Sequence, residues 1–122
     1  MFELSQTFHF DAAHTLRRDA ASAAEANASR RIHGHSYNAE VTLRGEPAPD
    51  TGMLLDLAVL RAAIAEVRDS LDHHHLDEVP GLGLPTLENL CLYIHRALVH
   101  LPGLHAVSVW RASTGDRCRY EP

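Results

Sequence analysis

The chain contains no lysine: all eleven of its basic residues are arginines, and its formal net charge is −5. A protein that neutralises a phosphate backbone needs a broad cationic surface, which this composition does not provide. The sequence therefore argues against nucleic acid as a partner. It also has no apolar run near the ~20 residues that span a bilayer, and MFELSQTFHF shows no signal-peptide pattern. We expect a cytoplasmic protein without membrane contact.

Cysteine is scarce. Cys91 and Cys118 form neither a CxxC pair nor a dense framework, so we expect two free thiols. Apolar residues make up 45% of the chain and charged residues 22%, which is ordinary for a folded soluble domain. The 122 residues suit a single domain, residues 1–122, with a small core. Association with other subunits is a common way to enlarge such a core.

Hydrophobic periodicity divides the chain into four strands and two helices. Apolar residues alternate with polar ones in four segments, as in strands with one buried face. Between the second and third of these, apolar residues recur at helical spacing in two segments, which Asp56 and Thr86 can cap. The expected strands are 2–10, 35–44, 104–110 and 117–120, and the expected helices are 57–71 and 87–101. This order predicts an α+β fold.

Three histidines are placed to converge near the ends of the first two strands. His33 and His35 lie two residues apart at the start of the second strand, so both side chains project to the same side. His14 has the parity of the apolar residues of the first strand and follows its end. Three imidazoles with an open fourth position form the usual arrangement of a catalytic zinc site. The alternative is an exposed pair, His33 and His35, that binds no metal.

A second chemical cluster lies in LDHHHLDE, residues 71–78. One interpretation is a solvated helix end, where cationic histidines are favoured by the helix dipole. The other is that Asp72 orients the neighbouring His73, raises its basicity and allows it to move protons near neutral pH. The motif alone does not decide between them.

Five segments, in this order, carry a resemblance to a known family: FHFDAAHTL, RRIHGHSYNAEV, DTGMLLDLAVL, LDHHHLDEVPGLGLPTLENL and AVSVW. Over nearly its whole length the chain resembles the 6-pyruvoyltetrahydropterin synthase and 6-carboxytetrahydropterin synthase family. The resemblance implies the T-fold, or tunnelling fold, a ββααββ unit with an antiparallel sheet and two helices on one face. Subunits of that family join their sheets into a barrel, commonly a hexamer. We therefore expect a homohexamer.

The resemblance also implies a chemistry. Family members bind zinc through histidines that match His14, His33 and His35, and they relay protons through residues that match Asp72 and His73. Their small-molecule substrate is a dihydropterin triphosphate, whose side chain is rearranged and cleaved with loss of triphosphate. The Zn²⁺ acts there as a Lewis acid on side-chain oxygens, which makes neighbouring protons easier to move.

Two positions keep the family's pocket and two depart from it. Thr86 and Glu88, in PTLEN, match residues that line the pterin pocket, although they also suit an N-cap and a first-turn acid. Ser29 stands where the family carries a proton-abstracting Cys, and a hydroxyl is a far weaker acid than a thiol with its pKa of about 8.5. Arg111 stands where the family carries a pterin-binding Glu. Arginine only donates hydrogen bonds, so it suits a carboxylate, a phosphate or a carbonyl-rich ring.

Three functions are consistent with these residues. The first is a zinc-dependent lyase of the family type, in bacteria usually the 6-carboxytetrahydropterin step towards 7-deazaguanine compounds such as queuosine. The second is a zinc enzyme with a shifted substrate and reaction, which Ser29 and Arg111 favour. The third is a ligand-binding protein that has lost the chemistry, against which the intact Asp72 and His73 argue. We predict the first, with the second as the close alternative.

Overall fold

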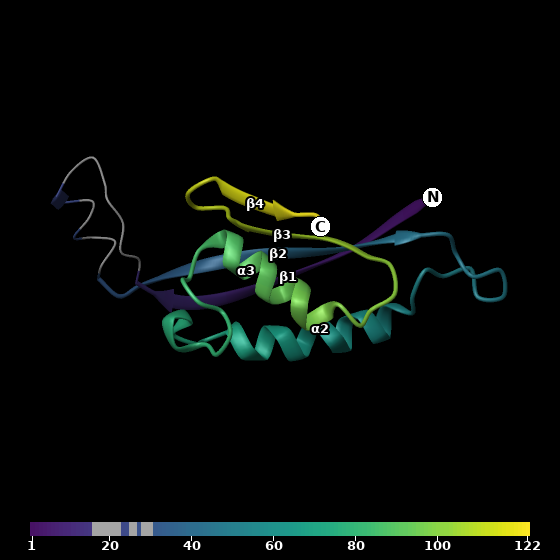
Figure 1. Ribbon diagram of the computed structural model, residues 1–122, viewed down its shortest axis with the longest axis horizontal. Coiled ribbons are helices and arrows are strands. Elements are labelled where there is room, and N and C mark those ends of the chain that lie inside the picture. The colour runs from purple at the N-terminus through teal and green to yellow at the C-terminus, as the bar shows by residue number, and fades with distance from the viewer. Residues whose placement is uncertain (16–22, 25–26, 28–30) are drawn as a thin grey trace.

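The protein folds as a four-stranded antiparallel sheet with two α-helices (Figure 1), in a computed structural model that describes residues 1–15, 23–24, 27 and 31–122. The strands follow one another in the sheet in chain order, β1-β2-β3-β4. The elements are β1 (Phe2–His14), β2 (His33–Gly45), α2 (Leu57–Leu71), the short 3₁₀ helix η1 (Leu76–Glu78), α3 (Leu87–Leu98), β3 (Leu104–Arg111) and β4 (Asp116–Tyr120). The predicted α+β class and element order are confirmed.

The two long strands β1 and β2 position one end of the sheet. Each has 13 residues, and they pair over their full length, from Phe2 opposite Gly45 to His14 opposite His33. β1 therefore continues four residues past the predicted end at Phe10, because the start of β2 offers a pairing partner for every one of them. This register places the ends that carry the histidines side by side.

The core lies between one face of the sheet and the two helices. Inward residues alternate along β1 and β2, while the helices bury residues three or four apart, as each period requires. Burial of each large apolar side chain contributes roughly 1.5–3 kcal/mol. The largest fully buried side chains are Tyr37, Phe10, Leu43, Leu60, Leu71, Leu76, Leu90, Ile94, Leu98, Val41, Val107 and Val109.

Both predicted helix caps are present. Asp56 accepts a hydrogen bond from the backbone N–H of Ala58 at 2.8 Å, and the hydroxyl of Thr86 accepts one from Asn89 at 3.2 Å. The helix α3 ends at Leu98, three residues before its predicted end. The proline of LPG disfavours helical backbone in the residue before it, so the apolar periodicity outlasts the helix.

The outer edges of β1 and β4 have no paired strand within the described residues. Unpaired edges are templates for pairing with another chain. Cys91 and Cys118 are free thiols, as predicted. Among the described residues, the helices fall short of the length and apolar character that a membrane crossing requires.

Candidate metal centre and adjoining cavities

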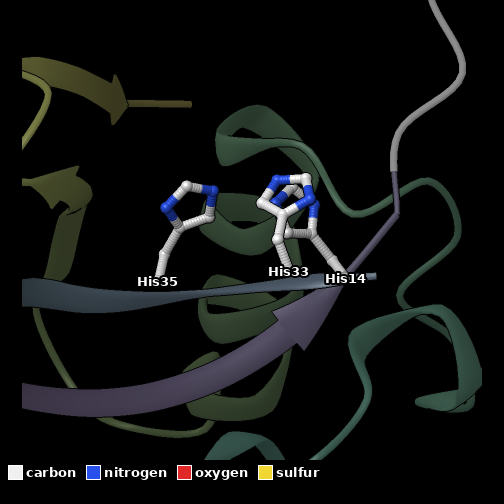
Figure 2. A group of neighbouring side chains, drawn as sticks. All are labelled: His14, His33 and His35. Atoms are coloured by element: carbon white, nitrogen blue, oxygen red, sulfur yellow. The ribbon is translucent and has the colours of Figure 1, made fainter. Parts of the chain in front are cut away.

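Three histidines meet at the end of β1 and β2. His14 closes β1 and pairs with His33, the first residue of β2, while His35 follows two residues along. Their rings lie on the same side of the two strands (Figure 2), with centroids 4.5 to 5.0 Å apart. One possible ligand nitrogen from each ring lies within 4.8 Å of the other two. The structure thus brings together all three ligands predicted from the sequence.

The surroundings of His14 and His35 favour the neutral forms of these two rings. Burial lowers the pKa of His14 to about 4, and the neighbouring imidazoles and Arg111 add to the shift. Burial lowers the pKa of His35 as well, with the Arg111 guanidinium as the next cause. A metal binds the lone pair of a neutral imidazole. His14 and His35 are therefore in the protonation state that metal binding needs at pH 7.

Hydrogen bonding fits the cluster to a cation. The Nδ1 of His33 lies 2.8 Å from the carbonyl oxygen of Arg31, which can only accept, so Nδ1 carries the proton and Nε2 keeps its lone pair. Both ring nitrogens of His14 are buried without a hydrogen-bond partner among the described residues. An unpaired buried polar atom is costly, and a metal would satisfy one of them. An all-imidazole donor set suits Zn²⁺.

Arg111, the last residue of β3, lies beside His35. Its Nη1 is 3.2 Å from Nε2 of His35, and its Nη2 donates to Oδ2 of Asp116 at 2.8 Å. Asp116 is held opposite Arg111 by the β3–β4 register and also accepts a hydrogen bond from Thr114. Burial raises the pKa of Tyr37 to about 12, so its phenol stays protonated near the guanidinium. A cation therefore borders the candidate metal centre.

A cavity of about 500 Å³ adjoins the histidine cluster. It unites three residues that the sequence assigned to substrate binding, Thr86, Glu88 and Arg111, with the metal-ligand candidate His14. Glu88 is exposed in the first turn of α3, and Thr86 is half-buried at its N-cap. The remaining lining residues are Tyr37, Pro85, Leu87, Asp116, Arg117 and Cys118. Two acidic side chains, Glu88 and Asp116, and two basic ones, Arg111 and Arg117, thus share one cavity with the cluster.

His73 lines a different cavity, of about 490 Å³, whose lining also includes His35, and Asp72 precedes His73 in the chain. The backbone N–H of Asp11 donates to Oδ1 of Asp72 at 2.9 Å and lowers the pKa of that carboxyl, with further lowering from charge interactions with His73 and Arg68. The Nε2 of His73 is 3.8 Å from the same oxygen, and its side chain is 80% exposed. His73 also has a positive φ of 58°, which is uncommon outside glycine.

Two carboxylates that support these residues were not predicted from the sequence. Asp116 holds Arg111, and Asp11 accepts the hydroxyl of Ser36 at 2.6 Å while its backbone holds Asp72. The TGD turn was a signal for Asp116, because a tight hairpin sets it opposite the end of β3. Asp11 gave no signal, since its partners are distant in sequence. Ser29, the candidate catalytic residue at the position of the family's proton-abstracting Cys, lies outside the described residues.

Fold and site together define an α+β unit that carries a candidate metal centre at one end of its sheet and a ligand-sized cavity beside it. The family model described as 6-pyruvoyl tetrahydropterin synthase matches residues 3–122. The chain belongs to the 6-pyruvoyl tetrahydropterin synthase family, and its fold is the T-fold. The resemblance drawn from the sequence motifs is confirmed.

Known relatives span nearly the same length. A 6-carboxy-5,6,7,8-tetrahydropterin synthase of Synechocystis is 32% identical over 129 residues, covering 100% of this chain and 95% of the relative. A dihydroneopterin monophosphate aldolase of Pyrococcus furiosus is 32% identical over 99 residues, covering 78% and 83%. The structure of the Caenorhabditis elegans 6-pyruvoyl tetrahydropterin synthase superimposes with a TM-score of 0.82 at 28% identity, covering 99% and 95%. Relatives of this chain thus carry the names of enzymes with different reactions.

Proposed function

We propose that the protein is a zinc-dependent lyase of the 6-pyruvoyl or 6-carboxytetrahydropterin synthase type, acting on a dihydropterin triphosphate or a related compound. The observation that carries the proposal is the three-histidine cluster in direct contact with a ligand-sized cavity. Relatives of full length are named as pterin synthases, which supports the substrate class.

His14, His33 and His35 would hold the zinc ion, which supplies Lewis acidity towards oxygens of the substrate side chain. The N–H of His33 towards Arg31 fixes the ring so that its lone pair faces its neighbours. The carboxylate of Glu88 can accept hydrogen bonds from the N–H edge of a pterin ring in the cavity. These roles require no residue from another chain.

Asp72 and His73 would serve as the proton relay. Asp72 is held ionised by the backbone N–H of Asp11 and can orient and charge the adjacent imidazole. In one subunit, however, His73 lines a cavity other than the one that contains Glu88 and Arg111. Its exposure suits a role towards the cavity of a neighbouring subunit.

We therefore propose a homo-oligomer, a cytoplasmic hexamer in which the site is completed between chains. The open edges of β1 and β4 support this arrangement, because continuing the sheet into another subunit pairs them. A protein that sediments as a monomer at micromolar concentration would contradict it.

One observation favours a second function, a family enzyme with a shifted substrate and reaction. Arg111 presents only donors to the cavity, so it cannot replace an acceptor that binds the N–H edge of a pterin. A lost acceptor leaves buried N–H groups unpaired, at a cost of roughly 1–3 kcal/mol each. The relative named as a dihydroneopterin monophosphate aldolase shows that a homologue can act on another pterin phosphate.

Product analysis of the purified protein tests the proposal. Dihydroneopterin triphosphate should be converted to a 6-pyruvoyl or 6-carboxy product, and conversion should require His33. Under the second function this substrate is untouched, while Arg111→Glu restores pterin binding and the added Ser29→Cys restores turnover. If wild type is inactive and the double variant gains neither, the first function fails and the pocket has diverged beyond these two residues, which leaves a different substrate or a pure binding role.

A further inference from the structure

The contact between Arg111 and His35 has a direct bearing on metal binding. The guanidinium bridges two partners: Nη1 lies 3.2 Å from Nε2 of His35 and Nη2 lies 2.8 Å from Oδ2 of Asp116. Its Nε is buried without a partner among the described residues. The side chain is 20% exposed, so it is largely enclosed between β2 and the β3–β4 hairpin. This is a fixed cation within hydrogen-bond reach of a candidate metal ligand.

The protonation of both groups makes this contact incompatible with metal binding by His35. Arginine can only donate, so Nε2 of His35 accepts and the ring proton sits on Nδ1. A neutral imidazole has a single in-plane lone pair, and here the guanidinium uses it. If Nδ1 bound the metal instead, Nε2 would carry a proton, and two donors would face each other at 3.2 Å. Neither tautomer of His35 serves Arg111 and a metal together.

We propose that Arg111 and the metal compete for Nε2 of His35, so that Arg111 sets the metal affinity of the centre and metal binding frees its guanidinium for an anionic ligand. The inference rests on the proposed metal centre and not on the proposed reaction. Arg111 weakens the site against a cation both by occupying the lone pair and by its charge. It therefore acts on the metal centre through His35 and not as a ligand.

Asp116 gives the released guanidinium a second anchor. The carboxylate is fixed by the hydroxyl of Thr114 at 2.7 Å and keeps its bond to Nη2 when Nη1 leaves His35. Arg111 then stays in the wall of the cavity that also contains Glu88 and His14. Its free N–H groups suit the oxygens of a phosphate or carboxylate. By linkage, such an anion would raise the metal affinity and the metal would raise affinity for the anion.

Competition for zinc against a chromophoric chelator measures the first part of the proposal. Arg111→Met removes the donor and the charge while keeping an unbranched side chain, and we expect its zinc affinity to rise by about 10–100-fold, as large a change as the loss of a supporting outer-shell partner causes in the opposite direction. Arg117→Met is the matched control, because Arg117 lines the same cavity but pairs with Trp110 and Glu40. Equal zinc affinity of wild type and Arg111→Met would overturn the competition.

The tautomer of His35 separates lone-pair competition from simple charge repulsion and uses the unaltered protein. In chelator-treated wild type, ¹⁵N spectra should show His35 protonated on Nδ1, with Nε2 accepting a hydrogen bond. In Arg111→Met the ring should lose this preference. A wild-type ring protonated on Nε2 would overturn the proposal even if the variant did not fold.

Inorganic phosphate and acetate are the probes for the second part. Phosphate, added to the same chelator competition, should raise zinc affinity in wild type several-fold more than in Arg111→Met, and the comparison cancels the binding of phosphate to zinc in solution. A response to acetate alone would assign the ligand group as a carboxylate. Identical responses of the two proteins to both anions would overturn the anion role of Arg111. If no variant binds zinc at all, the proposed metal centre itself is wrong, an outcome distinct from equal affinities.

Discussion

The two histidine-containing clusters of the chain differ in how completely one subunit builds them. His14 is 3% exposed, and the rings around it are oriented by the pairing of β1 with β2. His73 has 80% of its side chain exposed and follows Asp72 at a backbone turn with positive φ. In the first cluster the rings are preorganised, and the guanidinium of Arg111 occupies the lone pair of His35 that a metal would use. In the second cluster the carboxylate of Asp72 is held in place, whereas the imidazole of His73 is exposed. This exposure fits an imidazole whose partner is supplied by another subunit.

The largest expected effect is the loss of turnover on substitution of Asp72 or His73. Asp72→Asn and His73→Ala should each lower turnover by about 10²–10⁴-fold, the usual contribution of a general acid–base group. Zinc content should stay at the wild-type level, because neither residue belongs to the buried cluster. Steady-state assays with metal analysis of the same samples check both statements. If zinc is lost together with activity, Asp72 and His73 contribute to the metal centre, and the two clusters form a single site.

Mixed oligomers test whether the clusters act across subunits. His33→Ala and His73→Ala should each be inactive, and hetero-oligomers of the two should recover activity, up to about a quarter of wild type for random mixing with one contribution from each chain. Co-refolded mixtures compared with separately refolded variants give the measurement. If mixing recovers nothing while hetero-oligomers form, both clusters serve the same chain and the contrast drawn above is wrong.

The dependence of the free energy of unfolding on acidic pH should differ between His14, in the buried cluster, and Asp72, in the exposed one. The pKa of His14 is about 4 in the folded protein against 6.5 for an unperturbed imidazole, so the unfolded chain binds the proton first. The free energy of unfolding should therefore fall as the pH drops from about 6.5 towards 4, by about 1.4 kcal/mol for each unit of pKa difference. Asp72, whose pKa is lowered from 3.8, contributes stability that is lost only below that window.

Urea unfolding with a chelator present, at several pH values, measures this dependence. His14→Gln should flatten the pH dependence, whereas His9→Ala should leave it intact because His9 is exposed on the same strand. Equal slopes for wild type and His14→Gln would show that burial of His14 does not govern the acid response.

The smallest expected effect concerns Thr86, which caps α3 at the wall of the cavity. Thr86→Ala should lower the free energy of unfolding by about 1 kcal/mol, the usual cost of a lost N-cap, and Thr86→Ser should restore most of it. Chemical denaturation measures the loss, and zinc content should not change. If stability is unaffected while ligand binding weakens, the hydroxyl serves the ligand and not the helix.

Local sequence patterns were sufficient to predict that His14, His33 and His35 converge, but not to predict the contact that Arg111 makes with His35. The parity of His14 with Phe10, and of His33 with His35, follows from the period of a strand, so their convergence could be predicted once the two strands were paired. The contact of Arg111 with His35 depends on how β3 is aligned with β2, which sequence periodicity does not set. A resemblance to the family marked Arg111 as a departure without placing it against a metal ligand.

The sequence motif predicted Asp72 and His73 as a candidate cluster, but it did not predict the residue that holds Asp72 in place. LDHHHLDE allowed either a solvated helix end or a proton relay, and the structure adds the backbone of Asp11 as the group that holds Asp72. Asp11 and Asp72 are 61 residues apart in sequence, so no local pattern could join them. The sequence could not predict contacts between residues that are far apart in the chain, such as this one between β1 and the end of α2.

Metal analysis of the purified protein tests the central claim most directly, namely that His14, His33 and His35 of one chain form a complete metal centre. We predict about one zinc per chain in wild type and in the exposed-histidine control His9→Ala. In His14→Ala, zinc affinity should fall by more than the roughly 10–100-fold that an outer-shell partner costs. Wild-type protein without zinc after loading and dialysis, or His14→Ala with an unchanged zinc content and affinity, would contradict the account.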